Sequence, residues 1–307
     1  MEGERAVTLA LASGRSPIWL SRVLADYWAL TKPDVNFLIL ITTAAGFFLA
    51  HSTRPVACPI VLLIHTLIGT LLLAGGTATL NQYAEQQFDA QMRRTKRRPV
   101  ADGRITRLSA LKFGIALSIT GTVYLARAVN PLASLLGLIT LFSYLLLYTP
   151  LKRRTPFCTL IGAFPGAVPP LIGWAAATGT LSADAWVLYL IVFLWQFPHF
   201  MAIAWMYRED YQRAGYLVLP RGEQKNSFMA WQTLIPSLGL IALNLALALF
   251  SREAVPITAV WLLMSILFLI YGRQLVMRKT AIAARRLLLA SIIYLPLVFV
   301  LFMLRLI

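Results

Sequence analysis

Acidic residues, cysteines and histidines are scarce in this sequence. Its 307 residues include 12 Asp and Glu, two cysteines and three histidines, against 28 Lys and Arg. Charged residues of both signs make up only 13% of the chain, whereas soluble domains contain about 25%. A soluble domain is therefore excluded, although the chain is long enough for two.

Hydrophobic residues make up 59% of the sequence, and the mean hydropathy is +0.71. They form nine apolar segments, most of them close to the length of about 20 residues that a membrane-spanning helix needs. We therefore predict an all-α polytopic membrane protein with nine transmembrane helices around a central cavity. Residues 1–34 are expected to form a polar arm with an interfacial helix, and residues 35–307 the transmembrane domain. The predicted spans are 35–50, 59–80, 108–128, 131–149, 157–178, 185–206, 230–250, 255–272 and 287–307.

The distribution of Lys and Arg predicts how the chain crosses the membrane. Of these 28 residues, 24 lie in or beside the N-terminal arm and the loops on its side, and four lie on the other side. The positive-inside rule then places the N-terminus and its arm in the cytoplasm and, after nine spans, the C-terminus outside. Cys58 and Cys158 fall at opposite faces, so no disulfide is expected. Because the cations occupy short loops, we do not expect nucleic acid as a partner.

The polar stretch after the second apolar segment contains a row of oxygen donors followed by a cluster of cations. Asn81, Glu85 and Asp89 recur every four residues, and on a helix they share one face. Arg94 and Arg98 belong to the cationic cluster that follows. Oxygen ligands suit Mg²⁺, and guanidinium groups bind phosphate oxygens, so the stretch predicts a magnesium-diphosphate site. A merely basic cytoplasmic loop would explain the arginines but not the acids along an apolar helix end.

A second acidic loop follows the sixth apolar segment and contains Asp210. We predict that Asp210 joins Asn81, Glu85 and Asp89, and that these four residues are both catalytic and metal-binding. Acidic loops after the second and sixth spans are typical of duplicated halves that share a central site. Coincidence is the alternative, because every cytoplasmic loop is polar.

Two features inside the apolar segments also point to a site. Within the segment 148–179, Pro165, Pro169 and Pro170 lie among four glycines, which indicates either broken backbone that lines a cavity or close helix packing. Lys152 follows Tyr148 by one helical turn and is placed to reach a diphosphate from the side. His199 lies within the sixth segment, where an imidazole needs a hydrogen-bond partner, a metal or a cofactor.

These motifs resemble those of the UbiA superfamily of intramembrane prenyltransferases. The run NQYAEQQFDAQMRRTKRRP from Asn81 is similar to the first acidic motif of the superfamily, and YREDYQRAGYLVLP from Tyr207 is similar to the second. Within the superfamily, the M-x-R-T-x-x-R-P run from Met92 and the WQFPHF run from Trp195 resemble the subfamily that farnesylates haem.

The resemblance implies transfer of the farnesyl group of farnesyl diphosphate to a vinyl group of haem b, which gives haem O for terminal oxidases. It implies Mg²⁺ as the cofactor, a place in the bilayer of the bacterial inner membrane, and haem A synthase or oxidase assembly proteins as partners. His199 is then a candidate axial ligand of the haem iron, with a bond to a haem propionate or to another helix as alternatives. The expected substrate-binding residues are Arg94, Arg98, Lys152, Tyr148, Tyr207 and His199.

Two other functions remain open from the residues alone. The acceptor could be an aromatic acid or a quinone precursor, as in other members of the superfamily, although the WQFPHF run argues against that. The protein could also be a secondary transporter of anionic substrates, with broken helices around a central site. A transporter should hold its important charges near the bilayer midplane, whereas the acids here lie at the cytoplasmic helix ends. This placement favours an enzyme.

Overall fold

The computed structural model describes residues 17–52, 59–222, 224–250 and 255–305. Cys58 and the first sixteen residues lie outside this part, so the disulfide prediction is not tested. Within it the chain forms helices and no strand, which confirms the all-α class. Nine segments of the described chain are long and apolar enough to cross a membrane.

Seven of these spans are single helices, and two are interrupted. The single helices are α3 (Pro33–Ser52), α4 (Ile60–Asp89), α5 (Arg107–Ala128), α10 (Ala183–Met206), α12 (Gln224–Phe250), α13 (Val255–Arg278) and α14 (Ala281–Arg305). The interrupted spans consist of α6 (Pro131–Phe142), the π-helix η1 (Ser143–Tyr148) and α7 (Thr149–Leu151), and of α8 (Cys158–Gly166) and α9 (Pro169–Thr178). Outside the spans lie α2 (Pro17–Leu30) and α11 (Arg208–Arg213).

Several helices extend beyond the predicted apolar segments at the end where the basic loops lie. Helix α4 continues nine residues past the predicted end at residue 80, and α12 and α14 each begin six residues before the predicted starts at 230 and 287. The length of an apolar segment indicates only the part of a helix that the bilayer covers. Polar turns at the helix ends are therefore missed when spans are predicted from hydropathy. The extension of α4 matters most, because it places the whole acidic motif on one continuous helix.

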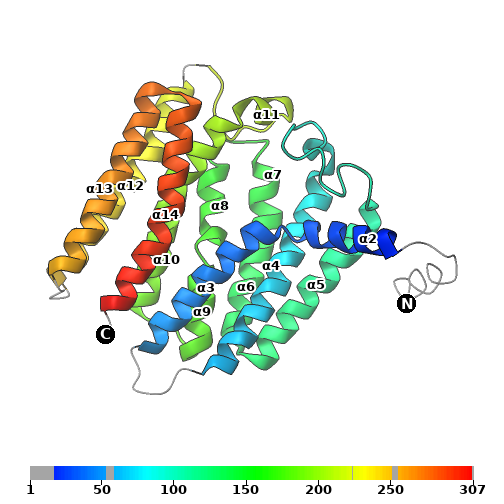
Figure 1. Ribbon diagram of the computed structural model, residues 1–307, viewed down its shortest axis with the longest axis horizontal. Helices are drawn as coiled ribbons and strands as arrows, with labels where there is room; N and C mark the ends of the chain where they lie inside the picture. The colour runs from blue at the N-terminus through cyan, green and yellow to red at the C-terminus, as the bar shows by residue number, and fades with distance from the viewer. Residues whose placement is uncertain (1–16, 53–58, 223, 251–254, 306–307) are drawn as a thin grey trace.

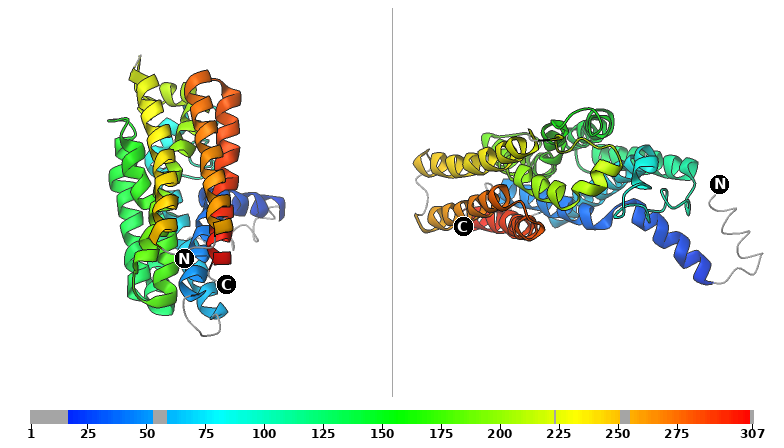
Figure 2. Two further views of the ribbon diagram at one scale, coloured as in Figure 1. Left: turned by 90° about the vertical axis from the view of Figure 1, so that its left-hand side faces the viewer. Right: turned by 90° about the horizontal axis from the view of Figure 1, so that it is seen from above.

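The spans stand side by side, with α12, α13 and α14 at one edge and α4, α5 and α6 at the other (Figure 1). Helix α3 packs against α9 in the middle of the molecule, and α10 packs against α14. Helix α2 lies across the bundle instead of along it (Figure 2). It exposes Leu24 and Trp28, while Tyr27 makes an edge-to-face contact with Phe113 of α5. An exposed apolar face on such a helix is typical of an interfacial helix.

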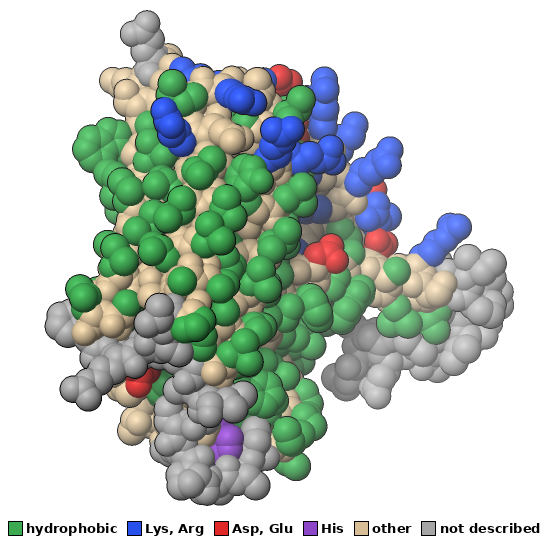
Figure 3. Space-filling model, turned by 60° about the vertical axis from the view of Figure 1, so that its left-hand side comes forward, with side chains coloured by type: hydrophobic (Ala, Val, Ile, Leu, Met, Phe, Trp, Pro, Cys, Tyr) green, Lys and Arg blue, Asp and Glu red, His purple; other side chains and the backbone are tan. Residues whose placement is uncertain are grey.

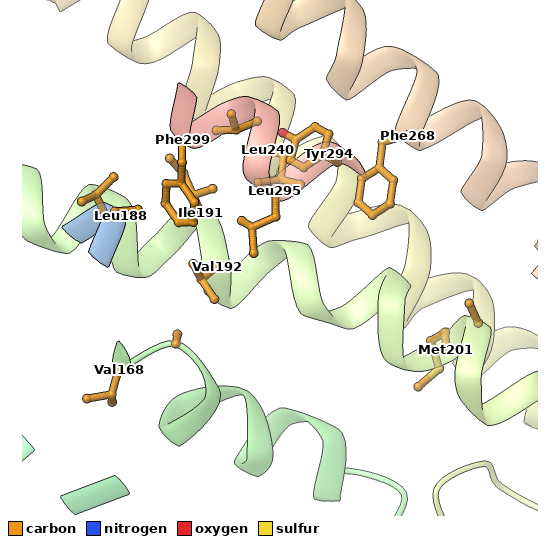
Figure 4. Packing of buried hydrophobic residues seen from close by; sticks show 14 of the residues in the cluster. Val168, Leu188, Ile191, Val192, Met201, Leu240, Phe268, Tyr294, Leu295 and Phe299 are labelled. Carbon is orange, nitrogen blue, oxygen red and sulfur yellow. The ribbon is translucent and has the colours of Figure 1, made fainter. Parts of the chain in front are cut away.

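The α10 side of the bundle contains the main hydrophobic core. Leu188, Ile191 and Val192 of α10 face Leu295 and Phe299 of α14 (Figure 4). Many large apolar side chains elsewhere point outward and are half exposed, and they cover the side of the molecule that Figure 3 shows. Lysine and arginine side chains gather at one end of that face. An apolar girdle with one basic end is what a membrane protein requires.

Close packing holds α9 against α3 in the second interrupted span. A Cβ atom added to Gly173 of α9 would overlap the carbonyl oxygen of Thr43, and one added to Gly46 of α3 would overlap that of Pro170. Both glycines are required because the two backbones touch. The two readings of the Gly- and Pro-rich segment therefore hold together: α9 packs closely through glycine, while Pro165, Gly166 and Pro169, at the break between α8 and α9, line a cavity.

Candidate active site

The acidic motif forms a buried row at the end of α4. Asn81, Glu85 and Asp89 are 1%, 5% and 1% exposed, and all three belong to the same regular helix. The predicted helical spacing is thus confirmed. Three buried polar side chains at the end of a membrane helix require partners, and each of them has a cationic one.

Glu85 pairs with Lys152, which follows α7. The Lys152 Nζ donates to Glu85 Oε1 at 2.8 Å, and the two side chains are 12% and 7% exposed. The ammonium also lies 4.5 Å from the centroid of the Tyr148 ring. Burial alone would lower the pKa of Lys152, but the Glu85 carboxylate raises it well above its ordinary value. Lys152 is therefore held as a cation beside Glu85.

Tyr148 owes its place to a local change of helix type. It ends the π-helix η1, and its ring packs on Gly162 of α8, where a Cβ would lie 2.7 Å from the ring. Tyr144, one turn earlier, lies 5.0 Å from Tyr148 between ring centroids, and both tyrosines line the cavity described below. Short π-helical turns occur frequently at functional sites because they turn side chains out of the regular register.

Asp89 pairs with Arg98 across the basic loop. The Nη1 of Arg98 donates to both carboxylate oxygens of Asp89, at 2.8 and 2.7 Å. The loop between α4 and α5 consists of turns, so Arg94 and Arg98, four residues apart, do not share a helix face. The guanidinium of Arg94 instead lies over the ring of Tyr207, 4.9 Å from its centroid.

Asp210 joins the second acidic loop to the first. Its carboxylate accepts hydrogen bonds from the backbone N–H groups of Arg93 and Arg94, each at 3.2 Å, and it also pairs with Arg213. Asp210 is buried, whereas the neighbouring Glu209 has a largely exposed side chain. The two loops therefore meet as predicted, and Asp210 positions the basic loop above the α4 row.

Lys32 is a member of the site that sequence reasoning missed, because we counted it only as a topology signal. It occupies the turn between α2 and α3 with a positive φ of 52°, an uncommon backbone conformation for a residue other than glycine. Its Nζ donates to Asn81 Oδ1 at 2.6 Å. Two buried amides fix the turn: Asn36 donates to the carbonyl oxygen of Thr31, and Gln82 to that of Leu30.

The charge of Lys32 is poorly compensated in this structure. Burial lowers its pKa to about 7, and the nearby Arg98 charge acts in the same direction. Its close partner, the Asn81 carbonyl oxygen, is neutral. A buried ammonium without an anionic partner is stabilised by an anion that enters the site, so this position favours a phosphate-bearing ligand.

A cavity of about 320 Å³ connects this polar end with the interior of the bundle. Lys32, Tyr144 and Tyr148 line it at the polar end, and mostly apolar side chains of α3, α4, α6, α8, α9, α10 and α14 line the rest, together with several threonines and Gln196. Of the described residues that line it, Lys32 is the one lysine and His199 the one histidine. The predicted central cavity is present, and its apolar character fits a hydrocarbon chain.

His199 lies on α10 and lines the same cavity. Helix α10 ends at Met206 and α11 begins at Arg208, so His199 and Asp210 do not lie on one continuous helix. From His199 to the end of α10 is seven residues, roughly 10 Å along the helix axis. Its Nδ1 lies 2.7 Å from the hydroxyl of Ser291.

The α4 row has the donor types that Mg²⁺ prefers. Among the described residues, no three acids, histidines or cysteines are grouped closely enough to form a metal cage by themselves. Mg²⁺ that accompanies a phosphate is usually held by only one or two carboxylates, together with water and the phosphate oxygens. The buried oxygens of Asn81, Glu85 and Asp89 fit this mode of binding.

Comparison with known proteins shows the family. Residues 39–302 match a family model described as the UbiA prenyltransferase family. The chain belongs to this family. Its curated UbiA relatives include a protoheme IX farnesyltransferase of Solibacter usitatus, 45% identical over 282 residues, which are 90% of this chain and 97% of the relative. One of Koribacter versatilis is 39% identical over 306 residues, 97% of this chain and 98% of the relative.

Solved structures share the UbiA fold. A chain from a study of digeranylgeranylglyceryl phosphate synthase in membranes has a TM-score of 0.71 at 17% identity, over 92% of this chain and 98% of that one. A UbiA homologue from Archaeoglobus fulgidus, bound to GPP and Mg²⁺, has a TM-score of 0.63 at 13% identity, over 88% of this chain and 99% of that one. Membership of a prenyltransferase family favours the enzyme over the transporter.

Proposed function

We propose that this protein transfers the farnesyl group of farnesyl diphosphate to a vinyl group of haem b and so makes haem O. The observation that carries the proposal is one mostly apolar cavity. It is lined by Lys32, which contacts Asn81 of the α4 row, and farther along by His199. A prenyl diphosphate has the same polarity, with an anionic head and a hydrocarbon tail. The curated relatives that carry the name protoheme IX farnesyltransferase support haem as the acceptor.

The diphosphate is expected at the α4 row. Asn81, Glu85 and Asp89 would hold Mg²⁺, and the bound ion would neutralise charge on the leaving diphosphate. Lys152 and Arg98, whose present partners are those same carboxylates, then bind the phosphate oxygens. Lys32 reaches the same place from the turn before α3. Breaking the allylic C–O bond leaves the electron pair on the diphosphate, and these cations stabilise that product.

The cavity then controls where the allylic cation reacts. Tyr144 and Tyr148 line it next to the expected diphosphate, and the faces of aromatic rings stabilise a nearby cation. The apolar walls beyond them exclude water until the vinyl group has formed the new carbon–carbon bond. Water adds to the resulting cation afterwards and loses a proton, which gives the hydroxyl group of the product.

His199 is expected to hold the haem ring, through its iron. Imidazole is a common axial ligand of haem iron, and fixing the ring would direct one vinyl group towards the allylic carbon. Tyr207 and Arg94, which contact each other near Asp210, are proposed to close the cytoplasmic side of the site.

The decisive experiment incubates the purified protein with haem b, farnesyl diphosphate and Mg²⁺, and analyses the pigments by mass spectrometry. We expect haem O, and we expect its loss when a chelator is added. A parallel incubation replaces haem b by a 4-hydroxybenzoate or quinone-precursor acceptor. Prenylation of that acceptor without haem O would show that the enzyme is a UbiA prenyltransferase of a different substrate class.

We further propose that the arm, residues 1–34, and the basic loops face the cytoplasm of a bacterial inner membrane, with the C-terminus outside. The charge distribution supports this orientation. Reporter fusions after residues 52, 100 and 220 test it. A fusion at residue 100 that reports from outside would overturn both the orientation and the cytoplasmic diphosphate site. Co-purification with haem A synthase or oxidase assembly proteins tests the expected partners.

A further inference from the structure

Ser291 of α14 makes contacts that the diphosphate site does not explain. It is 0% exposed and lies where α14 packs on α10. The backbone carbonyl oxygen of Ser291 accepts a hydrogen bond from Trp195 Nε1 at 2.8 Å, and its hydroxyl lies 2.7 Å from His199 Nδ1. The rings of Trp195 and His199, one helical turn apart, stack at 4.9 Å with an interplanar angle of 27°. The imidazole plane is therefore held from two directions.

The hydroxyl of Ser291 also determines which nitrogen of His199 carries the proton. Ser291 Oγ lies 2.6 Å from the carbonyl oxygen of Leu288, an acceptor that has no proton to donate. A serine hydroxyl has a single proton, so it donates to Leu288 and must accept from His199. The opposite arrangement would leave two oxygen atoms 2.6 Å apart with no proton between them. His199 Nδ1 thus carries the N–H.

A neutral imidazole with a protonated Nδ1 has its lone pair on Nε2. No hydrogen-bond partner of Nε2 is found among the described residues, and His199 lines a cavity whose lining is mostly apolar and includes Ile292 and Phe299. An N–H at Nε2 would be left without a hydrogen bond among the described residues in this arrangement, whereas a lone pair suits a metal ion held by a substrate.

We propose that Ser291 is a positioning residue: it fixes the tautomer and the plane of His199 so that Nε2 binds the iron of the haem substrate. This inference rests on the proposed function, because it requires haem to enter the cavity. Histidines that bind metals usually donate their other N–H to an oxygen acceptor, and removing that acceptor typically reduces affinity or activity about 10- to 100-fold. The Ser291–Leu288 bond polarises the hydroxyl and strengthens its acceptor function.

The test measures haem b binding to the purified protein without farnesyl diphosphate, by absorption titration and by resonance Raman spectroscopy of the ferrous complex. We expect an iron–histidine stretching band in the wild type and its loss in His199→Ala. In Ser291→Ala the dissociation constant for haem should rise roughly 10- to 100-fold, and the band should shift. Ser291→Thr, which keeps a hydroxyl, should restore both towards the wild type.

Ser237→Ala is the matched control. Ser237 is also buried, and its hydroxyl also bonds a backbone carbonyl oxygen, that of Thr233, but it lies on α12 outside the cavity lining. This variant should leave the affinity and the band unchanged. Ser291→Cys covers the case in which Ser291→Ala does not fold, since a thiol keeps the volume but accepts weakly, and it should also weaken binding.

Two results would overturn the inference. One is a wild-type haem complex without an iron–histidine band. The other is a Ser291→Ala or Ser291→Cys protein with wild-type affinity and an unshifted band. Failure of the proposed function is a separate result, because it is measured as the absence of haem O in the assay of the wild-type protein and not from haem binding or the Raman band.

Discussion

Replacing Lys152 by methionine should destabilise the protein as well as inactivate it. The substitution keeps most of the side-chain volume and removes the charge that faces Glu85 at 2.8 Å, in a pair whose side chains are 12% and 7% exposed. Breaking one partner of a buried ion pair costs about 3–5 kcal/mol, because the other charge stays buried without a counterion. For a chain of this size we expect the midpoint of thermal unfolding to fall by roughly 6–10 °C.

A double variant separates stability from catalysis. In Lys152→Met with Glu85→Leu both charges are gone, and replacing a buried pair by apolar residues is often neutral or stabilising. The double variant should therefore recover the midpoint of the wild type and remain inactive. Arg153→Met is the matched control, since it removes a neighbouring but exposed cation that lies over the ring of Phe88.

The measurement is tryptophan fluorescence during heating in detergent, followed by the haem O assay on the same preparations. If the double variant unfolds at the temperature of Lys152→Met, the unpaired Glu85 is not the cause of the loss. If Lys152→Met unfolds like the wild type, the pair does not stabilise the ligand-free protein, and the reasoning is refuted.

Three further outcomes are expected. Asp89→Asn should fold normally but lose turnover, because it removes a metal-binding charge at nearly constant volume; turnover like the wild type, or turnover in excess chelator, would contradict the magnesium site. Lys32→Gly should still fold, since glycine adopts the positive φ freely, although Asn81 loses its partner. Its KM for farnesyl diphosphate should rise about tenfold or more through loss of a charge-assisted hydrogen bond; an unchanged KM would remove Lys32 from the site. Gly173→Ala should lower stability by about 1–3 kcal/mol, measured as the unfolding midpoint, because its Cβ overlaps the Thr43 carbonyl oxygen; an unchanged midpoint would show that α3 and α9 separate easily.

The spacing of Asn81, Glu85 and Asp89 was sufficient to predict the acidic face, because a helix converts a period of four residues into a row. The meeting of the Asp210 loop with the Arg94 loop followed from their similar positions after the second and sixth spans. The first can be predicted because α4 is a regular helix, and the second because both loops follow a span in the same way.

The position of Lys32 depends instead on contacts between segments far apart in the sequence. Gln82 donates a hydrogen bond to the Leu30 carbonyl oxygen, 52 residues away in the sequence. No sequence pattern around Lys32 predicts that contact. The π-helix that ends at Tyr148, whose ring packs on Gly162 of α8, was likewise not predicted from the sequence. Ser291 escaped notice because one serine in an apolar segment has no distinguishing pattern.

The buried ion pairs have a consequence for the order of binding. Glu85 and Asp89 already have counterions, so Mg²⁺ arriving alone must displace Lys152 and Arg98 and leave them without anions. Diphosphate arriving alone must take the same cations away from the carboxylates. When both ligands bind, the carboxylates pair with Mg²⁺ and the cations with the diphosphate, so no charged group is left without a partner. The two affinities are therefore thermodynamically linked: each ligand should tighten the binding of the other by the same factor, and the resting protein should hold neither firmly.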